Sequence, residues 1–202
     1  MPEIDIIASI FDADDFLEGY FADLIGQTIF EKCKVTLVSP NPSSKLIALS
    51  ELTNKLYGNV NLIKLDEDPG ISRCLNLAIE SSDAKYITIA NVDDRKREDS
   101  LLRHLIELEA NPNIDLVYAP SLLSTSPNET FFQNSCKSIY PCHEFDGLSG
   151  LLRHNSPHSN PMWRRTMLEK NGYFDENLRT AADGELWLRC VRGGSKFKMI
   201  KE

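Results

Sequence analysis

The first 120 residues alternate between short apolar runs and amphipathic segments, and this alternation constrains the fold more than any other feature of the chain. The apolar runs have the length of strands, and the segments between them repeat their apolar residues every three or four positions, as helices do. Five strands joined by four helices predict parallel pairing through right-handed crossovers, and hence an α/β fold. Asp14 and Asp15 are candidate caps for the first helix. The strands are expected at residues 3–10, 34–39, 60–65, 85–90 and 114–119, and the helices from Phe16, from Leu46 to near Gly58, over residues 71–82 and through residues 101–106.

The second half does not continue the alternation. Residues 121–150 scatter Ser, Asn, Pro and Gly among aromatic residues, which predicts a long surface excursion without regular structure. No low-complexity linker separates the halves, so a single domain over residues 1–202 is expected. The elements expected after the excursion are a strand at residues 161–165, a short helix at 165–170, a turn at 171–178 and a helix at 183–194 that begins at Asp183.

Composition excludes several classes of protein. The 202 residues are 42% hydrophobic, which is enough for a sizeable core, and the net charge of −8 argues against a general nucleic-acid binder. The five cysteines are odd in number and lack CxxC spacing, so neither a disulfide framework nor a zinc site is indicated. No apolar run approaches the ~18 to 20 residues of a membrane span, and no basic segment followed by an apolar run opens the chain. A cytoplasmic protein without an integral membrane segment is expected.

The fourth apolar run ends in acidic residues, in the stretch KYITIANVDDRKRED. Carboxylates at the end of a buried strand present oxygen ligands at the edge of the sheet where open α/β folds bind their ligands. A turn that caps the following helix is the commoner role for residues such as Asp93 and Asp94, and it is favoured when this stretch is taken alone. The three cations that follow, Arg95, Lys96 and Arg97, can meet phosphate charge, but a solvated helix start is the commoner role of such a run.

The order of the motifs resembles a known family. FDADDFLEGYFADLIGQT after the first strand, EDPGISRCLNLAI, the strand end NVDD, REDSLLRHLIELEANPNIDLVYAP and MWRRTMLEKNGYFDENLRTAADGELWLRC together resemble the nucleotide-sugar-dependent glycosyltransferases of family 2, which have the GT-A fold. The resemblance covers nearly the whole chain and lies in the series of motifs rather than in any one of them. It implies a Rossmann-like, mostly parallel sheet flanked by helices, with residues 1–120 as the nucleotide-sugar-binding half and residues 121–202 as the acceptor-side half.

The resemblance also assigns the two central carboxylates. Asn91-Val92-Asp93 matches the family's DxD motif, and Asp93 is the expected ligand of Mn²⁺ or Mg²⁺ on the donor diphosphate. A hard cation with oxygen ligands suits this task, because the leaving group is strongly anionic. Asp183 matches the base that takes the proton of the acceptor hydroxyl. From the residues alone, a helix cap is the commoner role for Asp183, and the resemblance is what favours the base.

Further residues are expected around these two. The resemblance places Phe11, Asp12, Ser39, Gly70 and Asn91 beside the donor, although Pro-Gly at residues 69–70 is also simply a turn. Glu185, Trp187 and His158 are candidates for the acceptor side. For Trp187 and His158, a structural role is at least as common.

Two departures from the family pattern leave an alternative open. Asn91 replaces the first Asp of the DxD motif and brings no charge, and residues 38–44 lack the acid that usually contacts the nucleoside. The prediction is an inverting, metal-dependent glycosyltransferase that moves a sugar from a UDP- or GDP-sugar to a glycan or lipid-linked acceptor in surface polysaccharide or glycoconjugate synthesis, in the cytoplasm or peripherally at the inner membrane face. The alternative is a non-catalytic sugar-nucleotide-binding or partner-binding domain with the same fold. A nucleotidyltransferase is a weaker third, since residues 9–16 lack a Gly-rich basic loop.

Overall fold

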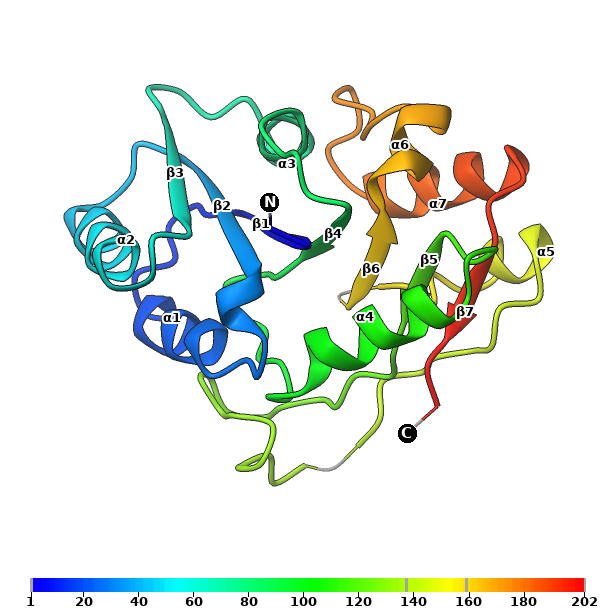
Figure 1. Cartoon of the computed structure of the whole chain (residues 1–202), viewed down its shortest axis with the longest axis horizontal. Coiled ribbons are helices and arrows are strands. Elements are labelled where there is room, and N and C mark those ends of the chain that lie inside the picture. Colours follow the sequence, from blue (N-terminus) through cyan, green and yellow to red (C-terminus); the bar gives the residue numbers. More distant parts are fainter. Residues whose placement is uncertain (1, 137, 159, 202) are drawn as a thin grey trace.

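The computed structural model describes residues 2–136, 138–158 and 160–201, and over these residues it forms one seven-stranded sheet with helices on both faces (Figure 1). The strand order is β3-β2-β1-β4-β6-β5-β7. All neighbouring pairs are parallel except those that involve β6, which runs antiparallel to both β4 and β5. The strands are β1 (Ile4–Ser9), β2 (Cys33–Pro40), β3 (Val60–Leu65), β4 (Tyr86–Ile89), β5 (Leu116–Tyr118), β6 (Pro161–Arg164) and β7 (Phe197–Met199).

Two apolar clusters hold the layers together, one on each face of the sheet. Buried residues of α1, α2 and α4 pack on one face, and buried residues of α3, α6 and α7 pack on the other. Successive strand residues point to opposite faces, so Met162 joins the first cluster and Trp163 the second, both fully buried. The helices are α1 (Leu17–Ile25), α2 (Ser44–Tyr57), α3 (Ile71–Glu80), α4 (Ser100–Ala110), α5 (Leu148–Leu151), α6 (Arg165–Asn171) and α7 (Ala182–Arg192), with a short 3₁₀ turn, η1 (Phe30–Lys32).

The predicted α/β fold is confirmed, and most expected elements lie within a few residues of their predicted positions. Helix α2 illustrates why: the Ser43 hydroxyl accepts from the Leu46 N–H at its start, and Gly58 ends it at a φ of 72°. The expected caps of α1 are wrong, because its N-cap is Phe16 and no side chain caps it. Asp14 instead accepts a hydrogen bond from the Ser43 hydroxyl.

The expected pairing of the fifth strand is also wrong. The five strands of the first half do not form one parallel run, because β6 inserts between β4 and β5. Strand β7, which the sequence reasoning did not assign, forms the edge beside β5. The sheet therefore draws strands from both halves of the chain.

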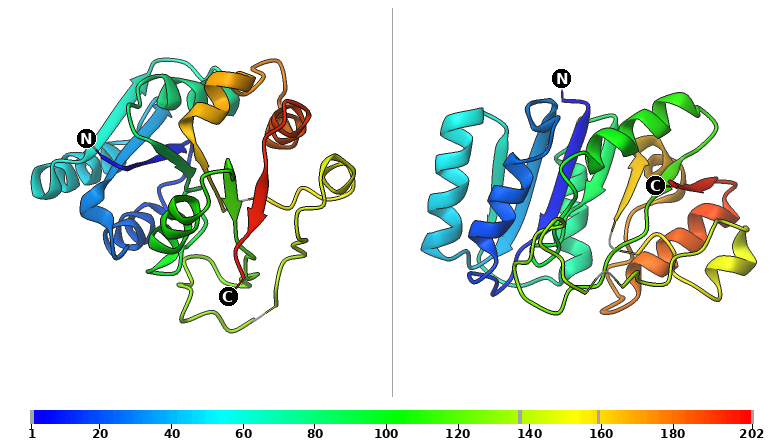
Figure 2. Two further views of the ribbon diagram at one scale, coloured as in Figure 1. Left: turned by 45° about the vertical axis from the view of Figure 1, so that its right-hand side comes forward. Right: turned by 90° about the horizontal axis from the view of Figure 1, so that it is seen from below.

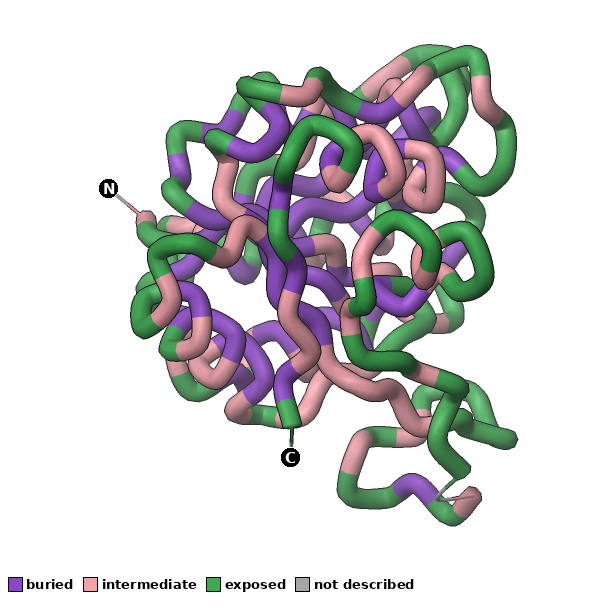
Figure 3. Tube along the Cα trace, turned by 90° about the vertical axis from the view of Figure 1, so that its right-hand side faces the viewer, coloured by how far each residue is buried: buried purple, intermediate pink, exposed green. Residues whose placement is uncertain are grey.

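The excursion expected at residues 121–150 is present and lies along one side of the molecule (Figure 2). It is mostly exposed (Figure 3). Within the excursion, residues 122 and 139 form an isolated antiparallel bridge, and the short helix α5 begins near its end. Among the described residues, no helix is long and apolar enough to span a membrane.

Candidate active site

The chain turns sharply after β4, and this turn carries the predicted metal-binding residues. The Asn91 side-chain amide donates to the Asp94 carboxylate over 3.0 Å, and the Asp94 main-chain N–H donates to the Asn91 carbonyl oxygen over 3.2 Å. Asn91 and Asp94 thereby stabilise the turn. The Asp93 carboxylate is exposed and has no hydrogen-bond partner in the described part of the chain. It is therefore free to bind a ligand.

The oxygen donors of this turn fit a magnesium or manganese ion that is shared with a phosphorylated ligand. Within residues 2–136, 138–158 and 160–201, no three His, Cys, Asp or Glu side chains gather into a cluster that could hold a metal by itself. Mg²⁺ commonly binds one or two carboxylates and completes its coordination with water and substrate phosphate. An exposed Asp93, with the Asn91 amide two residues before it, meets that requirement.

The predicted base lies in the first turn of α7. Asp183 is partly buried, and its Oδ2 atom accepts a hydrogen bond from Nδ2 of Asn155 over 2.6 Å. The N-cap of the helix is Ala181, which has a φ of 58°, and no side chain caps the helix. Asp183 therefore does not act as the cap. Its Oδ1 atom has no partner among the described residues and is available to accept a proton.

The segment that leads into β6 contacts the base through Asn155 and the loop after β4 through Asn160. Asn155 contacts Asp183 at one end of this segment. At the other end, the Asn160 side-chain oxygen accepts from Nζ of Lys96 over 2.9 Å, next to the Asp93 turn. The Thr88 hydroxyl donates to the Pro161 carbonyl oxygen over 2.8 Å, which fixes the segment to the end of β4. The loop that carries Asp93 and the helix start that carries Asp183 are thus both in contact with the segment that leads into β6.

Two predicted neighbours of the base have structural roles. The carboxylate of Glu185 pairs with the guanidinium of Arg189 through two contacts of 2.8 and 2.7 Å, and Arg189 in turn donates to the Tyr173 carbonyl oxygen. Trp187 is 1% exposed, and its ring centroid lies 5.4 Å from that of Trp163. The expectation that Trp187 lies on the acceptor side is wrong, because the side chain is enclosed in the core.

The residues predicted around the donor differ in accessibility. Phe11 and Asp12 follow β1 and are exposed, with a positive φ of 47° at Asp12. Gly70 precedes α3 with a φ of 91°, which favours glycine, and its N–H donates to the Asp68 carboxylate. Ser39 is 2% exposed, and its hydroxyl donates to the Ile10 carbonyl oxygen over 2.7 Å. The Ser39 hydroxyl is therefore used within the protein, and we leave it out of the donor site.

The third acceptor-side candidate, His158, is exposed. It lies in the segment that leads into β6, and its ring stacks on Tyr140 of the excursion with a centroid distance of 4.5 Å. It therefore connects the excursion to the predicted site.

The three cations after the acidic turn do not form a solvated helix start. Helix α4 begins later, at Ser100, and Arg95, Lys96 and Arg97 are all partly buried. Burial lowers the pKa of the Lys96 ammonium, against the opposing charge of Asp94 and Asp23. The side chains of these three cations are therefore partly enclosed by the protein rather than fully solvated.

His104 of α4 lies beside Lys96 and was missed from the sequence. Its two ring nitrogens contact the carbonyl oxygens of Ser100 and Asn160, at 2.7 and 3.1 Å. Burial, with a contribution from the charge of Lys96, lowers the pKa of His104 to about 4. The imidazole is therefore neutral at physiological pH.

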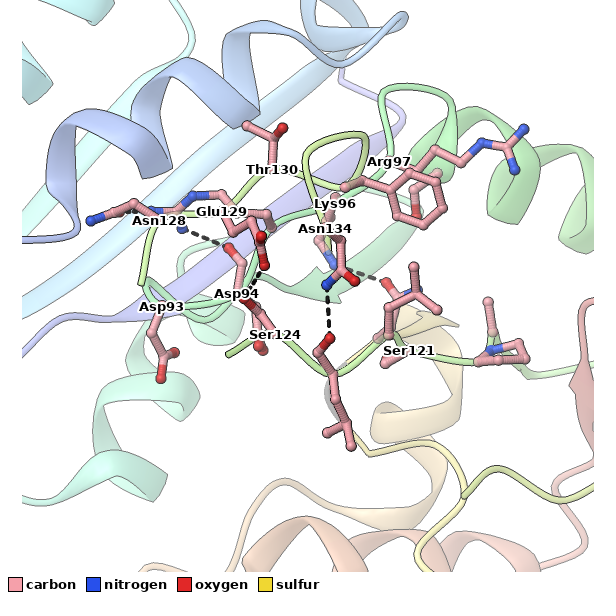
Figure 4. Close-up of a pocket in the computed structure, with 18 of the residues that line it drawn as sticks. Asp93, Asp94, Lys96, Arg97, Ser121, Ser124, Asn128, Glu129, Thr130 and Asn134 are labelled. Carbon is pink, nitrogen blue, oxygen red and sulfur yellow. Dashed lines mark hydrogen bonds between the residues drawn. The ribbon is translucent and has the colours of Figure 1, made fainter. Parts of the chain in front are cut away.

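A cavity of about 480 Å³ opens behind the acidic turn. Its walls are residues 93–97, the start of α4 and the first part of the excursion (Figure 4). Asp93 points away from the excursion's side chains in this view. Many polar groups of the wall bind one another: the Ser124 hydroxyl donates to Glu129, and the Asn134 amide donates to the Leu123 carbonyl oxygen. These bonds hold the excursion together, and the Arg95 guanidinium, which donates to the Asn128 side-chain oxygen, links it to the loop that carries Asp93.

Comparison with known sequences finds glycosyltransferases. No family model matches the chain. Over 98% of its length the chain is 24% identical to the glycosyltransferase MJ1057 of Methanocaldococcus jannaschii, and this match covers 67% of that protein. Over 99% of its length it is 24% identical to the teichoic acid poly(glycerol phosphate) polymerase of Staphylococcus epidermidis, of which it covers 27%. It is 22% identical to the glycosyltransferase EpsJ of Bacillus subtilis and spans 60% of that protein.

Solved structures share the fold. S. aureus TarS in complex with UDP-GlcNAc superimposes with a TM-score of 0.80 at 13% identity, over all of this chain and 56% of that one. The mannosyltransferase PcManGT of Pyrobaculum calidifontis, in complex with GDP-Man and Mn²⁺, gives a TM-score of 0.72 at 15% identity, over all of this chain and 55% of that one. The fold is therefore that of the GT-A glycosyltransferases. In sequence, the chain is a relative of glycosyltransferases over nearly its whole length, which confirms the resemblance of its motifs.

Proposed function

We propose that the chain is a glycosyltransferase domain that moves a sugar from a nucleoside diphosphate to an acceptor hydroxyl with inversion. The observation that carries this proposal is that Asp183 contacts Asn155 while Lys96, three residues after Asp93, contacts Asn160, so both carboxylates lie near the segment that leads into β6. Each carboxylate keeps at least one oxygen without a partner among the described residues. In a GT-A fold, this arrangement suits a donor held at Asp93 and an acceptor activated at Asp183.

The turn after β4 is proposed to bind the diphosphate of the donor. Asp93 would hold Mn²⁺ or Mg²⁺, and the Asn91 amide oxygen is available beside it. When bound, the ion neutralises the charge that develops on the leaving diphosphate. Phe11, Asp12 and Gly70 follow or precede the neighbouring strands and helix on the nucleotide-binding half of the chain, and they are the proposed contacts to the rest of the donor.

Asp183 is the proposed general base. As the acceptor oxygen forms its bond to the anomeric carbon, the bond from that carbon to the diphosphate oxygen breaks and the acceptor proton passes to Asp183. Attack on the face opposite the leaving group inverts the anomeric centre. The hydrogen bond from Asn155 holds one carboxylate oxygen and leaves the other to take the proton.

The acceptor is proposed to be a glycan or a lipid-linked precursor in surface polysaccharide synthesis. The support is the likeness to the teichoic acid polymerase of S. epidermidis and to TarS, which is solved with UDP-GlcNAc. UDP-sugars and GDP-sugars are both candidate donors, because PcManGT shares the fold and binds GDP-Man with Mn²⁺.

One observation favours a second function, a sugar-nucleotide-binding domain without transferase activity. Asn91 brings no charge to the turn, and it donates its amide to Asp94. Residues 38–44, which run from the end of β2 to the start of α2, also carry no acid. The two functions differ in whether donor binding is followed by transfer.

The experiment is calorimetry of UDP and GDP binding, with Mn²⁺ and then with EDTA. Metal-dependent binding is expected, and Asp93→Ala should abolish the metal dependence while it leaves the fold intact, because an exposed substitution usually costs within ~0.5 kcal/mol. Asp83→Ala is the matched control, since Asp83 is an exposed aspartate that precedes β4 rather than following it. Equal affinity with Mn²⁺ and EDTA would refute the role of the metal. Unfolding of the Asp93 variant would show that the residue is structural.

A further inference from the structure

The guanidinium of Arg95 binds the main chain on both sides of Asp93. Its Nη1 atom donates to the carbonyl oxygen of Val92 over 2.9 Å and to that of Asp94 over 2.8 Å. The Val92 carbonyl belongs to the peptide unit that precedes Asp93, and the Asp94 carbonyl lies one residue after Asp93. A planar guanidinium that holds both of them fixes the backbone from which the Asp93 side chain projects.

The same guanidinium connects the turn to two other parts of the molecule. Its Nη2 atom donates to the carbonyl oxygen of Phe16, the N-cap of α1, over 3.1 Å and to the side-chain oxygen of Asn128 in the excursion. The Asn128 amide donates to the Asp15 carbonyl oxygen over 3.0 Å, and Asn128 has a φ of 61°. Asparagine is among the few residues that tolerate this conformation. Arg95, Asn128 and the start of α1 thus form a three-way contact behind the acidic turn.

Helix α1 leaves room for this contact. Gly19 lies inside the helix, where glycine is less favourable than alanine. A Cβ atom on Gly19 would lie 2.6 Å from Nη2 of Arg95 and 2.9 Å from the side-chain oxygen of Asn128. Both distances are shorter than real Cβ contacts, so a side chain here would displace the guanidinium. The space that the Arg95 guanidinium occupies, rather than helix propensity, therefore explains why residue 19 is a glycine.

We propose that Arg95 is a positioning residue that sets the direction of the Asp93 carboxylate, and that Gly19 permits it to do so. The inference rests on the proposed function, because it assumes that Asp93 holds the metal of a nucleoside diphosphate. Arg95 touches neither metal nor donor in this scheme and acts through the carbonyl groups of Val92 and Asp94. Lysine does not replace it, since Arg95 donates to four oxygens through two separate nitrogens, whereas an ammonium has three N–H donors on one nitrogen.

The test measures Mn²⁺ affinity in the presence of UDP by electron paramagnetic resonance, beside thermal unfolding of each variant. Loss of a group that orients a metal ligand typically weakens metal binding by about 10- to 100-fold. Arg95→Lys and Gly19→Ala should each weaken Mn²⁺ binding by about tenfold or more. Gly19→Ala should do so without a fall in unfolding temperature, because alanine favours the helix. Both changes disrupt the same contact, so the double variant should bind Mn²⁺ only slightly more weakly than either single variant.

Gly184→Ala is the matched control. Gly184 also lies inside a helix, α7, and a Cβ atom there meets nothing within 4 Å among the described atoms. This variant should bind Mn²⁺ with UDP as the wild type does. If Asp93→Ala weakens Mn²⁺ binding but Arg95→Lys and Gly19→Ala bind as the wild type, the positioning role is overturned and the proposed function stands. If the wild type binds no Mn²⁺ with UDP, the proposed function fails first and the positioning role fails with it.

Discussion

Replacement of Asp183 by asparagine separates catalysis from binding more sharply than any other change in this chain. The asparagine keeps the size of the side chain and an oxygen that can accept from Asn155, whose amide lies 2.6 Å from the present carboxylate. It loses the ability to take a proton. Transfer should therefore fall by roughly 10² to 10⁴, while donor affinity persists, since the donor is proposed to bind at the turn after β4.

The expected effect on the barrier exceeds the expected effect on stability. A fall of 10² to 10⁴ corresponds to about 2.7 to 5.5 kcal/mol in activation free energy. The hydrogen bond from Asn155 changes from a charge-assisted bond to a neutral one, which costs only about 1 kcal/mol in the free energy of unfolding. Measuring unfolding together with turnover therefore distinguishes the loss of the base from a loss of folded protein.

Glu185→Gln is the matched control, since it removes the same charge two residues further along α7. It breaks the pairing with Arg189, an i,i+4 pair that is worth about 0.3 to 0.5 kcal/mol, and it should leave turnover almost unchanged. The assay is release of nucleoside diphosphate with a responsive acceptor, beside donor titration of each variant. Retained turnover in Asp183→Asn would refute the role of Asp183 as base. Equal losses in the two variants would point to helix electrostatics instead.

Two further predictions concern base selectivity and pH. Residues 38–44 carry no acid, and the Ser39 hydroxyl is used within the protein. The affinities for UDP and GDP should therefore lie within about tenfold, or ~1.4 kcal/mol, of each other. Strong selectivity in the calorimetric titrations would contradict this. The pKa of His104 is lowered to about 4 from an ordinary value near 6.5, so the unfolded state binds its proton more readily and the free energy of unfolding should fall as pH decreases from about 6.5 to about 4. At 1.36 kcal/mol per pKa unit this contribution is about 3 kcal/mol, and chemical denaturation of His104→Gln should show a correspondingly weaker pH dependence over that window; equal slopes would contradict the assignment.

The elements of the sheet could be predicted from local patterns, whereas their order could not. Periodicity identifies β1 to β4 and the helices between them, because burial of one helix face or of a whole strand leaves its mark on the sequence. The strand at β6 is also visible, and two consecutive fully buried side chains, Met162 and Trp163, are typical of an interior strand. Nothing local says that it lies between β4 and β5 and runs antiparallel. That placement depends on contacts between distant segments.

The site shows the same division. The exposed carboxylate of Asp93 follows directly from an acidic strand end, and the resemblance places Asp183. Asn155 lies in an irregular segment, for which sequence periodicity gives no information, so its contact with Asp183 could not be predicted. The role of Arg95 is hidden for another reason. Three consecutive cations are typical of a solvated surface, and only the tertiary structure shows that Arg95 is turned toward the main chain and Lys96 toward Asn160.

The interior position of β6 also affects the synthesis of the chain on the ribosome. The free edge of β4 is covered only when β6 arrives, and the bond between Thr88 and Pro161 joins residues 73 positions apart. At about 5 to 20 residues per second, that interval lasts roughly 4 to 15 s. During it, β5 has emerged without either of its strand neighbours. Strands β4 and β5 are only four and three residues long, so they offer other nascent chains a short edge for pairing.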